Sequence, residues 1–312
     1  SRYGPECASY VSEGKVKTLM SNLQAIARDA LRGALEIRRR VSASNLQPIC
    51  IYDTAEQLGI DVIFRPEKSL GGLYNKTAQT ILIPTHRPPG RQTFTCAHEI
   101  GHWFFGHGTG IDEINDLEGF HENEPKERLV DIFASYLLMP PWAVRDAYKK
   151  RGWNVSNCAA SQAYTVAGQL GVGYQTLVQH LQLSLNLISS THAQELLRTT
   201  PKKLRCSLLG NNSARHLVIV DNWWGNVAVD LQVGDLAIIP VNVTVEGKSA
   251  VSVSDHELGQ LIEARQPGIS RAESHDESWA VFIRVSRKDF IGRSIYRHLE
   301  DPDVDDKTRS DI

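Results

Sequence analysis

Residues 94–105 read FTCAHEIGHWFF. This segment contains the pattern His-Glu-x-x-His, in which His98 and His102 stand four positions apart and Glu99 follows the first histidine. Residues four apart on a helix share one face and are separated by about 6 Å along the axis, so both imidazoles can reach one ion. The aromatic and aliphatic residues around the histidines make the expected helix apolar on nearly all sides, which predicts that it is buried.

Zinc is the ion that this pair of donors favours. It accepts imidazole nitrogen and carboxylate oxygen, and with three protein ligands it keeps a fourth position for water. In the alternative interpretation, His98 and His102 are polar residues at a helix surface that pair with the backbone or with acidic neighbours. The apolar surroundings argue against it, because two buried histidines beside a glutamate need a positively charged partner. We expect a Zn2+ site with Glu99 as a general base at its rim.

A second helical segment, residues 125–140, supplies a candidate for the third ligand. Glu127, Asp131, Ala134 and Leu138 lie on one stripe of this helix, and the small alanine allows another helix to approach closely. We expect Glu127 to bind the metal and Asp131 to accept the free ring N–H of a liganding histidine. On spacing alone, each carboxylate has a solvated surface charge as its alternative.

The pattern along the chain predicts an α+β fold in several parts. A helical periodicity over residues 16–41, short extended runs at 61–64 and 80–83, and the two helices of the metal site indicate a mainly helical domain with a small twisted sheet. Two helical patterns around Gly171-Val-Gly173 have the layout of a helix-turn-helix. After Thr199, short alternating runs separated by turn residues indicate a separate α+β domain. The expected parts are residues 1–145 for the domain with the metal site, 146–198 for the helix-turn-helix-like segment, 199–300 for the second domain and 301–312 for a disordered acidic tail.

Composition excludes some classes of function. The 34 basic and 36 acidic side chains leave a formal charge of -2, so the chain lacks the positive field of non-specific nucleic-acid binders. No apolar stretch approaches the ~20 residues that span a bilayer. The five cysteines are scattered, which is typical of a reducing compartment. We expect a cytoplasmic protein that does not bind membranes.

One cysteine is a candidate for the open position of the metal. Thiolates bind zinc well, and Cys7 is the best placed because it stands on an N-terminal segment that we expect to be flexible. Cys96 stands two residues before His98 and therefore points away from the shared histidine face. The alternative for Cys7 is a free surface thiol.

Several spaced motifs resemble the ImmA/IrrE metallopeptidases. In chain order they are Gly72 to Tyr74, Ile81 to Ile83, Phe94 to His102, Glu127, Phe133-Ala134 and Leu137 to Pro140, and the segment from Ala167 to Ile188 is similar to the helix-turn-helix end of that family. The resemblance implies a gluzincin-like zinc endopeptidase in which His98, His102 and Glu127 are the ligands and Glu99 is the base. Asp131 departs from the pattern, because the family usually has Asn there.

The resemblance also implies a partner and a second domain. Members of this family cut a helix-turn-helix transcriptional repressor that is encoded beside them, which switches on mobile-element, DNA-damage or phage-defence genes. The resemblance therefore implies a repressor as the substrate of this chain, and a GAF-like sensor for residues 199–300. In catalysis a further donor to the oxyanion is expected. The candidates, which the sequence does not rank, are His107, Tyr74, His121 and Tyr136.

Two other classes of function compete with an enzyme. One is a DNA-binding regulator with a structural zinc site, but its expected recognition helix, residues 174–185, contains no Lys or Arg for phosphate contacts. The other is a sensor in which the C-terminal domain binds single-stranded DNA or a small-molecule activator, because basic residues beside aromatic ones can stack bases. The alternative for this group is a solvated turn with tryptophans in the core. The group consists of Lys202, Lys203, Arg205, Arg215, Trp223 and Trp224.

Overall fold

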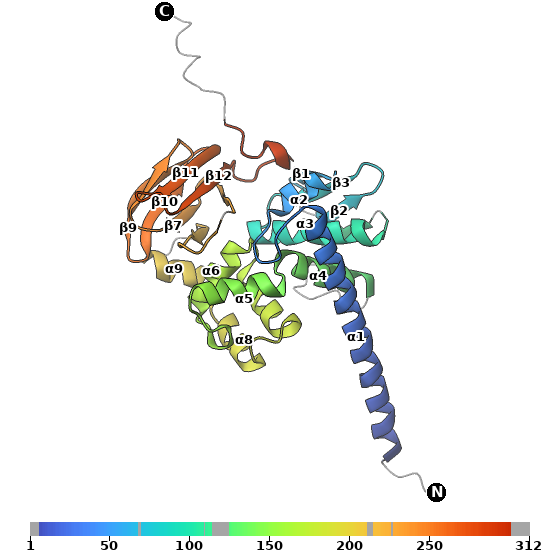
Figure 1. Cartoon of the computed structure of the whole chain (residues 1–312). Helices are drawn as coiled ribbons and strands as arrows, with labels where there is room; N and C mark the ends of the chain where they lie inside the picture. The colour runs from blue at the N-terminus through green and yellow to red at the C-terminus, as the bar shows by residue number, and fades with distance from the viewer. Residues whose placement is uncertain are drawn as a thin grey trace, which may run out of the picture.

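The computed structural model describes residues 6–67, 70–108, 110–113, 125–210, 215–225 and 227–300. Its helices are α1 (Glu6–Arg40), α2 (Ile51–Gln57), α3 (Pro89–Phe105), α4 (Pro125–Leu138), α5 (Pro141–Lys150), α6 (Ala160–Gln169), α7 (Tyr174–Gln179), α8 (Ser190–Leu197) and α9 (Pro201–Leu209) (Figure 1). No helix within the described ranges has the length and apolarity needed to cross a bilayer. The expected tail, residues 301–312, and the candidate donor His121 lie outside the described residues.

A five-stranded sheet supports the helices of the metal site. Its strand order is β13-β1-β3-β2-β4, and β1 runs parallel to β3 while the other pairs are antiparallel. The expected strands at residues 61–64 and 80–83 are confirmed as β1 and β3. The bounds of this sheet are β1 (Asp61–Arg65), β2 (Leu70–Asn75), β3 (Thr80–Pro84), β4 (Gly110–Glu113) and β13 (Gly292–Arg293).

Helix α3 crosses α4 at Gly101. The helix starts with Pro89 in its first turn, where the missing N–H costs nothing, and it ends at Gly106, which has a left-handed φ of 70°. A Cβ atom at Gly101 would lie 3.0 Å from side-chain atoms of Phe133 and Val130. Glycine at this position therefore allows the two helices to approach more closely than any other residue would.

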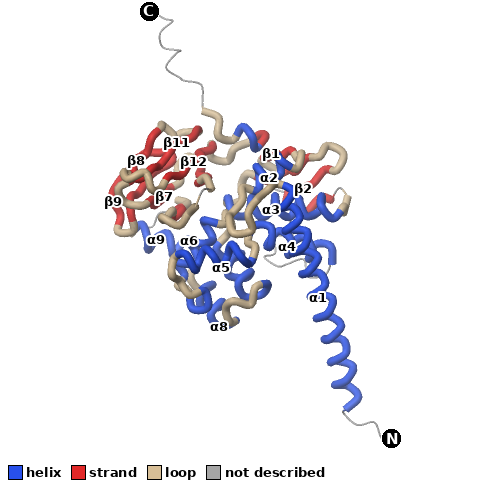
Figure 2. The backbone as a smooth tube through the Cα atoms, viewed as in Figure 1, coloured by secondary structure: helices blue, strands red, loops and turns tan. Residues whose placement is uncertain are grey.

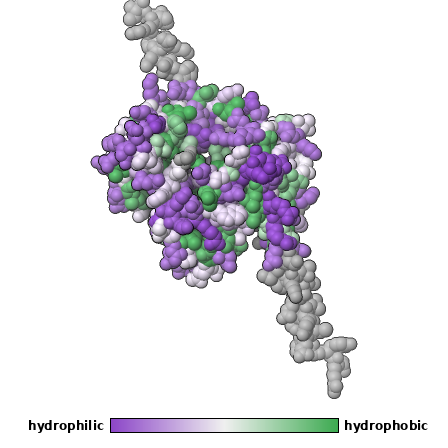
Figure 3. Space-filling view, in the orientation of Figure 1, coloured by the Kyte–Doolittle hydropathy of each residue, from purple (hydrophilic) through white to green (hydrophobic). Residues whose placement is uncertain are grey.

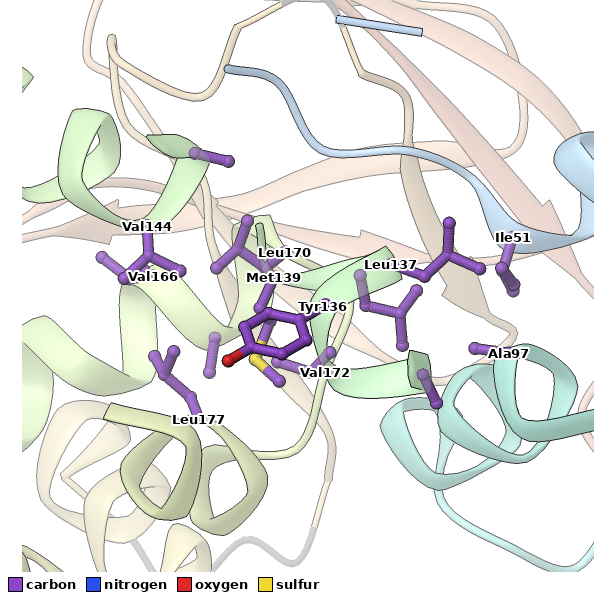
Figure 4. Packing of buried hydrophobic residues seen from close by; sticks show 14 of the residues in the cluster. Ile51, Ala97, Tyr136, Leu137, Met139, Val144, Val166, Leu170, Val172 and Leu177 are labelled. Carbon is purple, nitrogen blue, oxygen red and sulfur yellow. The ribbon is translucent and has the colours of Figure 1, made fainter. Parts of the chain in front are cut away.

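The helix-turn-helix-like segment shares its core with the metal domain. Helix α6 ends before Gly171, whose φ is 68°, and α7 follows, so the expected pair of helices is confirmed. The expected boundary between residues 145 and 146 is not a break, because α5 runs through it. Figure 4 shows why: buried side chains from α2 and α3 to α7 form one apolar layer. Its labelled members are Ile51, Ala97, Tyr136, Leu137, Met139, Val144, Val166, Leu170, Val172 and Leu177.

The C-terminal part is built from two four-stranded sheets, with strand orders β5-β7-β10-β9 and β6-β12-β11-β8. After α9, the part of the chain that the structure describes has no further α-helix, so the expected GAF-like arrangement is not confirmed (Figure 2). A second apolar core lies between these sheets. The strands are β5 (Leu217–Ile219), β6 (Val229–Gln232), β7 (Leu236–Ile239), β8 (Val243–Glu246), β9 (Ala250–His256), β10 (Gly259–Ala264), β11 (Gly268–Ser274) and β12 (Ala280–Ser286).

The chain returns from these sheets to the first one. Strand β13 pairs antiparallel with β1, with Ile63 opposite Arg293 and Phe64 opposite Gly292. Residues 199–300 are therefore not a domain joined by one linker, because their last part completes the sheet of the metal domain. On the face shown in Figure 3, hydrophobic residues form patches separated by hydrophilic ones.

The crossing at Gly101 can be tested by overpacking. Gly101→Val adds three carbon atoms where a single Cβ already meets Phe133 and Val130, so we expect a loss of stability of about 1–3 kcal/mol in urea unfolding. Gly168→Val in α6 is the matched control, because the nearest atom to a Cβ there is 3.8 Å away. Equal stabilities of the two variants would show that the crossing tolerates a larger residue.

Candidate metal centre

Two helices bring three ligand atoms together. Helix α3 contributes His98 and His102, whose Nε2 atoms lie 3.0 Å apart. Helix α4 contributes Glu127, whose Oε2 lies 3.3 Å from Nε2 of His98 and 3.4 Å from Nε2 of His102. The structure therefore places the three residues that the sequence indicated as ligands around one point.

The two separations to Glu127 fit a tetrahedral metal, and the two histidine nitrogens lie slightly closer together than this geometry requires. Zinc binds imidazole nitrogen and carboxylate oxygen at about 2.0–2.2 Å, which places neighbouring ligand atoms about 3.3–3.5 Å apart in a tetrahedron. Lone pairs of two imidazoles and a carboxylate that converge in this way repel one another unless a cation lies between them. Contacts with His102 and His98 also hold the pKa of Glu127 well below its usual range, so the carboxylate is charged at neutral pH. The donor set fits Zn2+.

Each histidine is oriented through its other ring nitrogen. Nδ1 of His98 lies 2.8 Å from Oδ1 of Asp131, the residue expected to accept this N–H. A proton on Nδ1 leaves the lone pair of Nε2 directed toward Glu127. Nδ1 of His102 lies 3.1 Å from Nδ1 of His107, so His107 accepts there when Nε2 of His102 binds a metal. Burial and then the neighbouring His102 lower the pKa of His107, which favours the neutral, accepting form.

The turn at the end of α3 explains how His107 reaches this place. Gly106 adopts the left-handed conformation that closes the helix, and the backbone N–H of His107 donates to the carbonyl of His102 at 3.0 Å. In the sequence His107 was one of four candidates for oxyanion stabilisation. The structure shows it in contact with His102, which only the geometry of the turn reveals, and its part in oxyanion stabilisation stays a prediction.

Glu99 is buried with 2% of its surface exposed, and it packs against strand β2. A Cβ atom at Gly72 would overlap Oε1 of Glu99 and lie 2.6 Å from Cγ2 of Thr95. The Gly71-Gly72 pair lies inside β2. Gly72 therefore leaves the space that the carboxylate of Glu99 occupies.

The other candidates from the sequence have different surroundings. The hydroxyl of Tyr74 accepts a hydrogen bond from Nε2 of Gln79 at 3.0 Å. The ring of Tyr136 meets the edge of the His180 ring in the apolar core. Cys7 falls within α1, but its side chain lies outside what the structure describes, so its thiolate role stays a prediction.

The Asp131 contact yields a test. Asp131→Ala removes the acceptor of the His98 N–H, and we expect the affinity for zinc to fall about 10- to 100-fold. Asp131→Asn keeps an oxygen acceptor at the same distance and is expected to stay closer to the wild type. Competition with a fluorescent chelator measures both affinities. A similar affinity for Asp131→Ala and the wild type would mean that Asp131 does not orient His98.

The same segment is similar to known proteins. Residues 55–182 match the model of the IrrE N-terminal-like domain. Radiation response metalloprotease IrrE of Deinococcus radiodurans is 30% identical over 132 residues, which are 40% of this chain and 40% of that protein. Its counterpart in Deinococcus deserti is 33% identical over 96 residues, 30% of this chain and 34% of that protein. The chain thus spans less than half the length of the curated relatives that it matches.

A solved structure of a Mycobacterium tuberculosis transcriptional regulator aligns at 12% identity and a TM-score of 0.35, covering 52% of this chain and 51% of that one. This structural similarity is too low to support a conclusion about the fold or the function. The family match, in contrast, includes all of α3 and α4, and with them each residue of the metal centre. The resemblance seen in the sequence is therefore confirmed: residues 55–182 match the IrrE N-terminal-like domain, and the similar curated proteins are IrrE metalloproteases.

Proposed function

We propose that this chain is a zinc-dependent endopeptidase that cleaves a helix-turn-helix transcriptional repressor. The observation that carries the peptidase part is the convergence of His98, His102 and Glu127, with the buried Glu99 next to His98 on α3. Three protein ligands leave a position open for water, whereas structural zinc sites are usually closed by four. The relatives that match this domain are named as metalloproteases, which supports the same proposal.

The roles follow from where each group lies. His98, His102 and Glu127 would hold the zinc ion, which would supply Lewis acidity. Glu99 follows His98 directly on α3, so its carboxylate lies at the rim of the site rather than among the ligands. It accepts the proton of the attacking water and later passes this proton to the leaving amine. Asp131 and His107 keep the imidazoles in the tautomers that direct Nε2 into the site.

The repressor as substrate rests on the family resemblance. The names of the two Deinococcus relatives refer to a radiation response, which supports a stress-regulated role in this chain. We propose that cleavage derepresses stress, mobile-element or phage-defence genes. The C-terminal sheets would receive the signal, either single-stranded DNA or a small molecule. Trp223 is 51% exposed and available for stacking, whereas Trp224 is buried and its indole N–H donates to the carbonyl of Val227.

The competing DNA-binding regulator has less support. Helix α7 turns Tyr174, Leu177 and Val178 into the core, and it contains no Lys or Arg. A recognition helix contacts phosphates and bases with its exposed polar residues. The buried Glu99 also has no use in a structural zinc site. These observations favour the enzyme.

A substitution of Glu99 separates binding from chemistry. Glu99→Gln keeps the size of the side chain but does not accept a proton at neutral pH, so we expect zinc to be retained. Cleavage should be slower by a factor of about 10² to 10⁴. The measurement incubates each protein with the helix-turn-helix protein encoded beside it, with and without single-stranded DNA, and detects fragments on a gel.

The control for this experiment is His102→Ala, which should lose both zinc and activity. Cleavage by Glu99→Gln at the wild-type rate would exclude Glu99 as the base. A wild-type protein that holds zinc but cleaves no neighbouring repressor would favour the regulator with a structural site.

Gly72 provides an independent test of how Glu99 is placed. Gly72→Ala puts a methyl group where Oε1 of Glu99 lies, so the carboxylate must move. We expect a lower kcat with zinc content unchanged, because the ligands on α3 and α4 do not touch this methyl group. Gly71→Ala in the same strand is the matched control. If the two variants had the same kcat, the close approach at Gly72 would have no catalytic role.

A further inference from the structure

A cavity of about 160 Å³ lies where three parts of the chain meet. The first turn of α3 forms one wall, the turn between α6 and α7 forms the second, and strands β6 and β12 of the C-terminal sheets form the third. Figure 1 shows α3 and the C-terminal sheets on opposite sides of this junction. The cavity is separate from the metal centre, whose ligands His98, His102 and Glu127 do not line it.

Aromatic rings line part of this cavity. Tyr52 of α2, Phe64 of β1, Phe290 and Trp224 all face it. The rings of Tyr52 and Phe64 meet edge to face with centroids 5.3 Å apart, and those of Phe64 and Phe290 do so at 6.1 Å. Rings fixed by such contacts offer rigid surfaces against which a flat molecule can pack.

Two arginines line the polar side of the cavity. Arg284 is fully engaged, because Asp230 accepts from its Nε at 2.5 Å and its Nη2 at 2.8 Å, and Asp53 accepts from its Nη1 at 2.9 Å. Arg297 is only 8% exposed, and its Nη2 makes only long contacts, at 3.4 Å to Asp230 and 3.5 Å to Asp53 and to Sγ of Cys50. Nη2 of Arg297 can therefore donate a stronger hydrogen bond to a ligand acceptor that lies closer.

His298 is the second underused group. The ring makes a weak hydrogen bond to the backbone of Val285, and the nearest carboxylate, Asp230, lies 3.7 Å away. Burial, and then the charge of Arg297, lower the pKa of His298 to about 4. The ring is therefore neutral at pH 7, and with its N–H turned to the backbone of Val285 it keeps one nitrogen as an acceptor. A buried polar atom without a partner is rare in folded proteins, so a bound molecule is the natural partner of this nitrogen.

The charge around the cavity is balanced. The two arginines face the two carboxylates of Asp53 and Asp230. The other imidazole in the wall, His216, is also neutral, because burial and then Arg205 lower its pKa to about 4. An anion in the cavity would meet the carboxylate of Asp230 in the wall, and both arginines are already paired with carboxylates. A neutral ligand is favoured over a carboxylate or a phosphate.

We propose that this cavity binds a small, neutral, flat nitrogen heterocycle with the chemistry of a nucleobase. An apolar cavity of about 150 Å³ holds one benzene ring, so a ring system of this kind fits the volume. Its faces pack on the aromatic walls, and its edge offers acceptors to Arg297 and a donor to His298.

Occupation of the cavity ties together the parts that line it. The first turn of α3 already touches the α6–α7 turn, because a Cβ at Gly90 would lie 2.6 Å from the backbone nitrogen of Gly173. A ligand that contacts both of these and β12 stabilises their arrangement, since binding to the folded state alone raises its stability. The ligand therefore acts on the helix that carries His98 and His102.

Calorimetry with adenine, cytosine and benzoate tests the proposal, because benzoate is a flat ring of similar size that carries a charge. Gly168 of α6 lines the cavity, and a Cβ there has no neighbour closer than 3.8 Å. Gly168→Leu fills the cavity and should weaken binding of the base at least tenfold, whereas the matched control Gly168→Ala should bind as the wild type does. His298→Leu keeps the volume, removes both polar atoms and should also weaken binding.

The melting temperature of each variant without ligand shows whether it is folded. If Gly168→Leu does not fold, His298→Leu alone decides whether the base lies in this cavity. Three results would overturn the proposal: no binding of either base at millimolar concentration, equal binding by the wild type and the folded variants, or tighter binding of benzoate than of the bases. The assay involves neither zinc nor proteolysis, so its outcome is independent of the peptidase activity.

Discussion

The close crossing of α3 over α4 is the constraint on which the metal centre depends. Gly101 lies between the two histidines in the sequence, and its missing side chain brings α4 near enough for Glu127 to complete the triad. Ligand atoms around zinc tolerate displacements of only about 0.2 Å. If the two helices lay further apart, Glu127 would be too far from His98 and His102 for the three residues to bind one metal ion. The geometry of the metal centre therefore depends on the packing of Gly101, which is not itself a ligand.

The sequence predicted the ligands because their signals are local. His98 and His102 share a face through a spacing of four, and Glu127 and Asp131 share one in the same way. Gly72 and His107 were not predicted in their roles, because these depend on contacts that spacing does not encode. Gly72 acts through the position of β2 against α3, and His107 through the left-handed turn that folds it back onto His102.

The pairing of β13 with β1 could not be predicted from the sequence for a similar reason. A strand of two residues has no periodicity, and its pairing joins residues more than two hundred positions apart. The alternating runs after Thr199 predicted strands there, and the structure contains them. The fold class, α+β, was also predictable. The GAF-like arrangement rested on similarity in size and placement alone, which does not fix how strands are ordered into sheets.

Ion pairs connect the C-terminal sheets to the domain with the metal site. Arg284 on β12 bonds to Asp230 on β6 and also to Asp53 on α2, so one side chain joins the C-terminal sheets to the domain with the metal site. Arg297 adds a second, looser link to the same two carboxylates and stacks over Tyr52 at 5.0 Å. The arginines are largely buried whereas Asp53 and Asp230 are 42% and 38% exposed, so separation of the junction would leave the two arginines without their counter-charges. A displacement of β12 would therefore act directly on α2 without a hinge, because Arg284 bonds to Asp53 and Arg297 contacts the same carboxylate.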